Sequence, residues 1–463
     1  MRGHLRGVLT VCAGALGLLG LSGNSFALGL PDPLHYDMGP LGNWDITGGI
    51  SAFGALWNND IPRTATASDQ TNGDVSIDNA LFIFNKTDGQ LQFTVWAGVP
   101  PQTPVMGWNT PNLGPNLSAF GNSTAGPGHS PGRNGFGHQD WLFKGWATYQ
   151  PVPWFSAQAG RLPSVDGTEI GVDWFNPTVF ISDLNNMQTT TANGGQINFI
   201  AGGDKAFYYG FVPGYGSTLT IRLADGYKAN NVNELGFTGL WNLNPDGSDN
   251  IVAFGHTRLA PAGNLGFAGF VGGFGTVNSD LIGIGGQYVW GNLTLIPQAQ
   301  YQWLPKDIIT GPNAPHADYH EVSAELTANY QIDARWAIDA QVQYIATEKC
   351  ARADGEQFGN GNCGTLAGAY GNYLALDNVT GGVNRAGLFN AGADMFGIQA
   401  GPVWQFHNLF VRPSVAWTHL SAFNHNSCTS DINSGTGYGH GGCDADQFVG
   451  IVEIGWLLGQ RAD

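Results

Sequence analysis

Polar and apolar residues alternate with a period of two along several segments of the chain, the pattern of a β-strand with two different faces. Residues 293–303, 321–330 and 336–344 show this alternation most clearly. In the second of these segments valine, alanine, leucine and tyrosine occupy one face, whereas glutamate, serine, threonine and asparagine occupy the other. Such strands separate an apolar environment from a polar one.

Short turns and long connections follow one another between the alternating segments. Tight turns are predicted at 87–89, 150–153, 291–292, 331–335 and 407–408. Long Gly/Pro/Asn-rich connections are expected at about 100–138, 163–193, 348–392 and 423–445. Short periplasmic turns and long extracellular loops are typical of outer-membrane barrels, which usually have an even number of strands. The sequence therefore predicts an all-β, transmembrane antiparallel β-barrel of about 16 strands, within a range of 14 to 18. The pattern is weakest between 203 and 280, where Lys205–Gly216 is open to interpretation as an insertion.

The composition supports this interpretation. Charged residues make up 11% of the chain, against about 25% in ordinary soluble proteins. Glycine is abundant, with 70 residues, aromatics reach 12%, and the mean hydropathy is only −0.10. Strands that alternate apolar and polar residues give a mean hydropathy near zero. Aromatic residues near strand ends suit the interfacial girdles of a barrel. These residues are Tyr301, Trp303, Tyr330, Trp336 and Tyr344. A secreted β-sandwich or β-helix is the alternative.

The start of the chain has the features of a secretory signal peptide. Residues 1–27 contain two arginines, a short apolar centre and small residues before the expected cleavage site at Ala27. We divide the remainder into a periplasmic lead-in, 28–42, and a transmembrane barrel, 43–463. The predicted location is the outer membrane of a bacterial cell, with its lipid as a partner. The formal net charge of −17 argues against a nucleic-acid partner.

Four cysteines follow the signal peptide, and the periplasm favours disulfide formation. Proximity suggests the pairs Cys350–Cys363 and Cys428–Cys443, although four cysteines permit three pairings. His425 and His440 form His-x2-Cys with the second pair, so a tetrahedral zinc site is the alternative there.

Charged residues within the strands are expected to face the lumen. An arginine or lysine facing lipid at mid-depth costs about 2–4 kcal/mol, so inward orientation is favoured. The pore-lining candidates are Lys144, Arg222, Glu321, Glu325, Asp339 and Arg412. Charges on opposite walls bias ion selectivity; the alternative is that they only pair with one another and hydrate the interior.

Several short motifs resemble the OmpL-like putative β-barrel porin family. They are Gly160-Arg161 at a strand end, Gly167-Thr-Glu169, Trp174-Phe175-Asn176 and Leu223-Ala-Asp225-Gly226-Tyr227. The resemblance implies an outer-membrane porin over most of the mature chain. It also implies that the loop with Asp166, Glu169 and Asp173 folds into the pore as a constriction; an ordinary acidic surface loop is the alternative.

The sequence thus predicts a passive channel for small hydrophilic solutes or ions, with a weak preference for cations. It requires no cofactor, catalytic residue or metal, and homo-oligomers are compatible with it. A barrel sheath that holds a periplasmic electron carrier or another partner protein is the second hypothesis. An outer-membrane enzyme is the third, although no spacing of Ser and His marks a nucleophile with its base.

Overall fold

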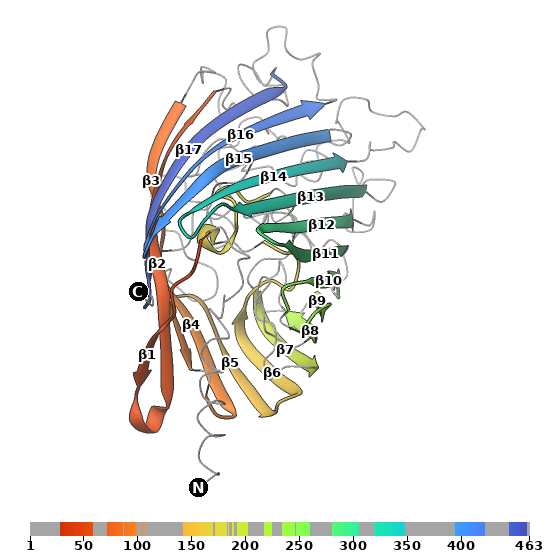
Figure 1. Ribbon diagram of the computed structural model, residues 1–463. Coiled ribbons are helices and arrows are strands. Elements are labelled where there is room, and N and C mark those ends of the chain that lie inside the picture. The colour runs from red at the N-terminus through yellow and green to blue at the C-terminus, as the bar shows by residue number, and fades with distance from the viewer. Residues whose placement is uncertain are drawn as a thin grey trace, which may run out of the picture.

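The protein folds into one closed antiparallel β-barrel (Figure 1), here in a computed structural model. The structure describes residues 28–58, 72–86, 88–99, 104, 106, 142–169, 172–182, 184, 188, 192–201, 217–224, 234–245, 247–259, 280–304, 319–347, 394–421 and 444–460. Within these residues sixteen strands, β2 to β17, each pair with their neighbours in chain order. The last strand pairs with the first: Val449 lies opposite Trp57, and Leu458 opposite Gly48. Closure satisfies the backbone of every strand without leaving an edge, and the predicted fold class and strand number are confirmed.

The strands are 8 to 15 residues long. Their bounds are Asn43–Trp57 (β2), Asn72–Lys86 (β3), Leu91–Val99 (β4), Leu142–Val152 (β5), Phe155–Leu162 (β6), Ala192–Ala201 (β7), Ser217–Ala224 (β8), Glu234–Asn242 (β9), Asn250–Arg258 (β10), Asp280–Trp290 (β11), Leu293–Leu304 (β12), Tyr319–Gln331 (β13), Trp336–Thr347 (β14), Asp394–Phe406 (β15), Leu409–Ser421 (β16) and Asp446–Leu458 (β17).

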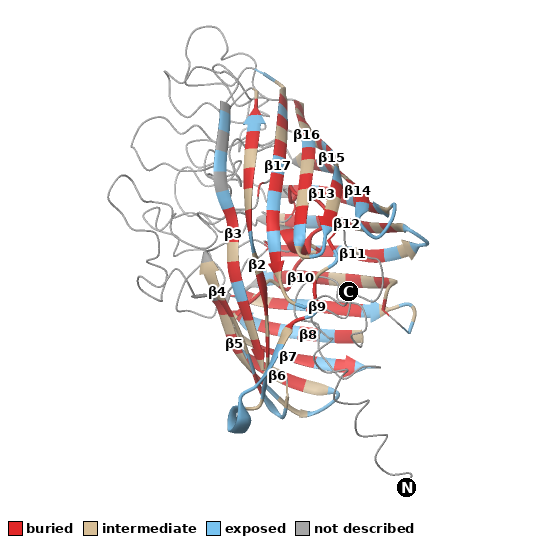
Figure 2. Ribbon diagram, turned by 60° about the vertical axis from the view of Figure 1, so that its left-hand side comes forward, coloured by how far each residue is buried: buried red, intermediate tan, exposed pale blue. Residues whose placement is uncertain are grey.

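Exposure alternates along the strands as the sequence pattern predicts, visible as red and paler bands in Figure 2. On β13 the side chains of Val322, Leu326 and Tyr330 are 53%, 40% and 50% exposed, whereas Glu321 and Glu325 are buried. The apolar face points outward because lipid solvates it, and the polar face points into the lumen. Among the described residues, no helix is long and apolar enough to cross a membrane.

Exposed aromatic side chains gather on the outer face near the strand ends. One group lies at the ends joined by short turns: Trp154, Trp241, Trp290, Tyr330, Trp336, Phe406 and Trp456. Tyr301, Tyr344 and Phe448 are exposed toward the other end. Aromatic rings at two levels are the interfacial girdles of an outer-membrane barrel. The architecture is therefore that of a bacterial outer-membrane protein.

The connections differ between the two ends of the barrel, which we call the turn end and the loop end. Each of the five predicted tight turns lies where two consecutive strands meet at the turn end, as in the two-residue connection His407–Asn408 between β15 and β16. The prediction at 150–153 begins too early, because β5 continues to Val152 and the connection is 153–154. The four predicted long connections join strands at the loop end, whereas the connection between β7 and β8, residues 202–216, is at the turn end. That the turn end faces the periplasm stays a prediction. The signal peptide, Lys205–Gly216, and all four cysteines with their neighbouring histidines lie outside the described residues.

The lead-in before β2 has structure of its own. A short strand, β1 (Leu34–Asp37), pairs with Asn43–Ile46 of β2, and a 3-10 helix, η1 (Gly39–Leu41), joins the two strands. β1 therefore lies on the edge of β2 that β17 occupies from Gly48 onward. Asp32 and Gln460 exchange two backbone hydrogen bonds of 2.8 and 2.7 Å, so the first described segment meets the end of β17.

Candidate functional site in the barrel lumen

The six predicted pore-lining residues all lie at buried positions of the strands. The six residues are at most 5% exposed, and those of their neighbours that are described are more exposed: Lys144 on β5, Arg222 on β8, Glu321 and Glu325 on β13, Asp339 on β14 and Arg412 on β16. Their positions belong to the lumen face. Their part in solute passage stays a prediction.

The connection between β6 and β7 enters this lumen. We call its described residues, 163–169, 172–182, 184 and 188, the inserted loop. It includes a second 3-10 helix, η3 (Asp173–Phe175), and Figure 1 draws it in yellow inside the ring of strands. Asp166 is buried and Glu169 is partly buried, whereas the side chain of Asp173 lies outside the described part of the structure. The loop thus runs inside the barrel rather than over its surface.

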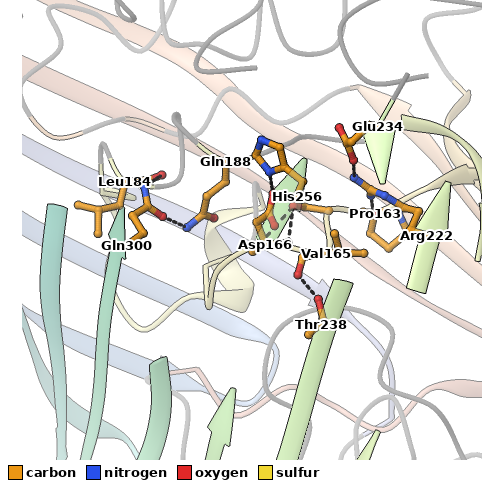
Figure 3. A network of polar contacts seen from close by, with 11 residues as sticks. Pro163, Val165, Asp166, Leu184, Gln188, Arg222, Glu234, Thr238, His256 and Gln300 are labelled. Atoms are coloured by element: carbon orange, nitrogen blue, oxygen red, sulfur yellow. Dashed lines mark hydrogen bonds and ion pairs between the residues drawn. The ribbon is translucent and has the colours of Figure 1, made fainter. Parts of the chain in front are cut away.

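Arg222 holds the start of the inserted loop (Figure 3). Its guanidinium donates to the carbonyl oxygen of Pro163 at 2.7 Å and forms an ion pair of 2.5 Å with Glu234 on β9. The hydroxyl of Thr238, also on β9, donates to the carbonyl oxygen of Val165. Arg222 is fully buried, and its charge is compensated by the acid of the neighbouring strand.

A buried histidine makes the next contact. His256 on β10 approaches Asp166 of the loop, with 2.8 Å between Nδ1 and Oδ2. Farther along, the side chain of Gln188 donates to the side-chain oxygen of Gln300 on β12 at 2.8 Å, and Gln300 donates to the carbonyl oxygen of Leu184 at 3.2 Å. Figure 3 shows the contact of His256 with Asp166 and that of Gln188 with Gln300. The loop is therefore held by the uncharged amides of glutamines as well as by arginine and histidine side chains.

Glu169 occupies the centre of the hydrogen-bond network. One carboxylate oxygen accepts from the backbone N–H of Ser182 at 2.9 Å and from its hydroxyl at 2.5 Å, which joins two parts of the loop. The other oxygen accepts from Gln341 on β14 at 2.6 Å. The side chain of Gln399 on β15 in turn donates to Gln341 at 2.6 Å and to the carbonyl oxygen of Phe180 at 2.7 Å. Glu169 therefore fixes both the shape of the loop and its place on the wall.

A second arginine holds the far side of the loop. Arg412 on β16 donates to the carbonyl oxygen of Asn176 at 3.2 Å and pairs with Glu453 on β17 at 2.7 and 2.5 Å. Arg412 and Glu453 are both fully buried and lie directly opposite each other in the strand register. Because Arg222 and Arg412 come from distant strands, the loop is tied to two separate parts of the wall.

Apolar packing covers the side of the loop that faces β2 to β5 and the last strands. Trp174 and Phe175 belong to a buried cluster with wall residues that include Trp96, Trp146 and Phe410. A second cluster contains the loop residues Val179 and Phe180 with wall residues of β2, β16 and β17. The loop thus makes its polar contacts along β8–β16, whereas the apolar clusters that contain it include residues of β2–β5 and of β14–β17.

Two wall glycines allow the loop to approach closely. A Cβ atom at Gly236 would lie 2.7 Å from Cγ2 of Val165, and one at Gly285 would lie 2.8 Å from Cγ2 of Thr168. Distances below 3.0 Å require the neighbour to move. Glycine at these positions therefore permits the observed contact between loop and wall.

Acidic groups dominate the charge of the lumen. The buried carboxylates on the described strands include Glu321, Glu325 and Asp339, which follow β13 and β14 from the loop end toward the turn end. Each of the two buried arginines is paired with a glutamate, so neither adds an uncompensated positive charge. Lys144 lies on a different wall, with its Nζ 4.6 Å from the centre of the Trp96 ring.

Sequence reasoning missed three residues of this site: Glu234, His256 and Glu453. Glu453 had a detectable signal, because it alternates with apolar residues in the last strand, next to the strand of Arg412. Glu234 pairs with Arg222 of the neighbouring strand. The contact of His256 is with the inserted loop, whose course has no periodicity from which to predict it.

Comparisons with known proteins find similarity in structure alone. No protein-family model and no curated protein sequence matches the chain. An anion-selective porin from Comamonas acidovorans is similar with a TM-score of 0.49 and 12% identity, covering 90% of this chain and 99% of that one. Salmonella typhi OmpF gives a TM-score of 0.45 at 13% identity, over 92% and 100% of the two chains. The outer membrane protein OpdK from Pseudomonas aeruginosa gives 0.39 at 10%, over 89% and 98%. Likeness at this level assigns no solute and no selectivity.

Proposed function

We propose that the protein is a porin-type passive channel of the outer membrane for small hydrophilic solutes or ions. The observation that carries this proposal is a closed sixteen-strand barrel whose outward face is apolar and whose inward face is polar. Barrels of 16 to 18 strands are wide enough to contain an aqueous path. Passive diffusion needs no bound cofactor and no catalytic group.

The charge of the wall supports a weak preference for cations. Glu321, Glu325 and Asp339 lie along β13 and β14, whereas the arginines are neutralised by their glutamate partners. Carboxylates that line a pore favour cations because their negative charge attracts cations and repels anions. We expect this preference to be lost in part when these acids are neutralised.

The inserted loop is the proposed constriction. Its anchors at Arg222, Glu169 and Arg412 fix a segment of the chain across the interior, and every anchor involves a buried wall residue. A rigidly held loop sets a constant limit on solute size. The acids of this loop, Asp166 and Glu169, are engaged with His256, Ser182 and Gln341 and so act mainly in positioning it.

The two other hypotheses fit the lumen less well. A sheath for a partner protein needs interior space that the inserted loop takes up, and stoichiometric co-purification of a haem protein would favour it nevertheless. An outer-membrane enzyme would need a nucleophile beside its base. An enzymatic activity that disappears on replacement of one serine or histidine would favour the enzyme hypothesis.

We further propose membership of the OmpL-like porin family, whose short motifs coincide with structural features of the site. Gly160, with φ of 144°, lies two residues before the end of β6, and a Cβ atom there would lie 2.4 Å from the carbonyl oxygen of Gly145. Gly167, with φ of 79°, precedes the network of Glu169. Trp174 and Phe175 belong to the apolar contacts of the loop.

Vesicle swelling and reversal potentials test the function together. Vesicles that contain the protein should admit small sugars faster than large ones. In a potassium chloride gradient the reversal potential should have the sign that indicates a higher permeability for potassium than for chloride. In Glu321→Gln/Glu325→Gln the potential should move toward zero, whereas Gln343→Asn on the same wall should leave it unchanged. A clear anion preference of the unmodified protein would refute the charge argument.

A further inference from the structure

The first described residues of the chain lie inside the barrel, next to the inserted loop. Leu28 is fully buried and belongs to the same apolar cluster as Trp174 and Phe175, and Leu30 packs against this cluster. In Figure 1 the dark red start of the described chain lies beside the yellow loop. Other members of the cluster, Val403 and Leu457, mark its place near the turn end.

One wall residue holds this segment by its backbone. The side chain of Gln405 on β15 accepts from the N–H of Gly29 at 2.7 Å and donates to the carbonyl oxygen of Gly29 at 2.8 Å. A paired contact of this kind fixes an extended segment in position without any need for a particular side chain at residue 29. Gln405 is itself buried, so the contact lies within the barrel.

The end of the last strand holds the segment a few residues later. Asp32 and Gln460 exchange backbone hydrogen bonds, and a Cβ atom on Gly459 would lie 2.4 Å from the carbonyl oxygen of Asp32. Glycine at 459 therefore allows the segment to pass. The segment is thus fixed at residue 29 by the wall and at residue 32 by the chain end.

From these contacts we infer that residues 28–33 are a second lumenal element, docked on the inserted loop from the turn end, which holds the loop in place and limits the open area. The docking site consists of Gln405, Gly459 and the apolar cluster around Trp174. The effect on the open area rests on the proposed channel function, whereas the docking of residues 28–33 does not.

The docking is tested by trimming with an aminopeptidase. The protein is purified from outer membranes, its first residue is read by mass spectrometry, and the folded protein is incubated with the enzyme. We expect the unmodified protein to be trimmed slowly. Gln405→Ala removes two hydrogen bonds, and we expect trimming to be roughly tenfold faster, because cleavage follows the population of the open form. Gly459→Val should act in the same direction through steric conflict, and Tyr36→Ala, at an exposed position of β1, is the matched control.

Single-channel currents of the same variants then test the effect on the loop. Gln405→Ala and Gly459→Val should show larger or noisier open currents than the control. Trimming of the unmodified protein at the rate of an unfolded peptide would overturn the docking, as would equal rates in all variants. Faster trimming with unchanged currents would overturn the role in limiting the open area. Slow trimming of the unmodified protein, together with no current from it or from any variant, would support the docking and refute the channel function.

Discussion

Removal of Arg412 should cost the barrel far more stability than removal of Arg412 together with its partner. Arg412 and Glu453 are fully buried and paired at 2.7 and 2.5 Å. Arg412→Met leaves the carboxylate of Glu453 buried without its counter-charge, a loss of about 3–5 kcal/mol in the free energy of unfolding. In Arg412→Met/Glu453→Gln neither position carries a charge, and the remaining loss is about 1 kcal/mol, mainly from the hydrogen bond to Asn176.

Urea unfolding of the protein in lipid vesicles measures these differences, with tryptophan fluorescence as the signal. Arg335→Met is the control, because Arg335 lies in the turn before β14 and its guanidinium lies 5.0 Å from the ring of Phe406. Its loss should be below about 1 kcal/mol. A single variant no less stable than the double variant would refute the argument that the pair compensates buried charge.

Three further outcomes follow from the structure. Gly236→Val should displace the inserted loop and destabilise the barrel by about 1–3 kcal/mol, whereas Gly450→Val, with open space around its Cβ, should not; equal urea midpoints would contradict this. Partial burial opposes the charge of Asp88 in the turn after β3, but contacts with Lys86 and the backbone of Asn43 lower its pKa below the ordinary value of 3.8. The charged carboxylate therefore stabilises the protein above that value, and the benefit fades as the pH falls through the lowered pKa. Asp88→Asn should consequently be less stable at about pH 7 and equal to the unmodified protein at about pH 2; a constant difference would argue against the charge. Finally, intact mass before and after thiol alkylation should show the four loop cysteines oxidised, and four alkylated cysteines without a reductant would exclude the disulfides.

The wall of the barrel could be predicted from the sequence because the orientation of a side chain in a strand follows from its neighbours in the chain. Alternation along 321–330 fixes which side chains meet lipid, and the apolar residues on either side of Glu325 and Asp339 suffice to orient these two acids inward. The turns could be predicted for the same reason: Gly291 and Asn292 end one strand and allow the next to begin.

The inserted loop could not be read in the same way. Its position depends on contacts between residues far apart in the chain, such as Thr168 with Gln298 and Glu169 with Gln341. The glutamines of β12–β15 are ordinary polar wall residues in the sequence, and only the folded loop makes them anchors. Arg222 pairs with Glu234 and Arg412 pairs with Glu453, the arrangement that the sequence left open as an alternative. That both arginines also bind carbonyl groups of the loop could not be predicted from the strands.

Single-channel recording of the purified protein in planar lipid bilayers tests the central claim most directly. The account predicts discrete current steps that grow with salt concentration, with a reversal potential on the cation side in a salt gradient. A correctly folded barrel, shown by its heat-dependent gel mobility, that gives no current steps would contradict the account.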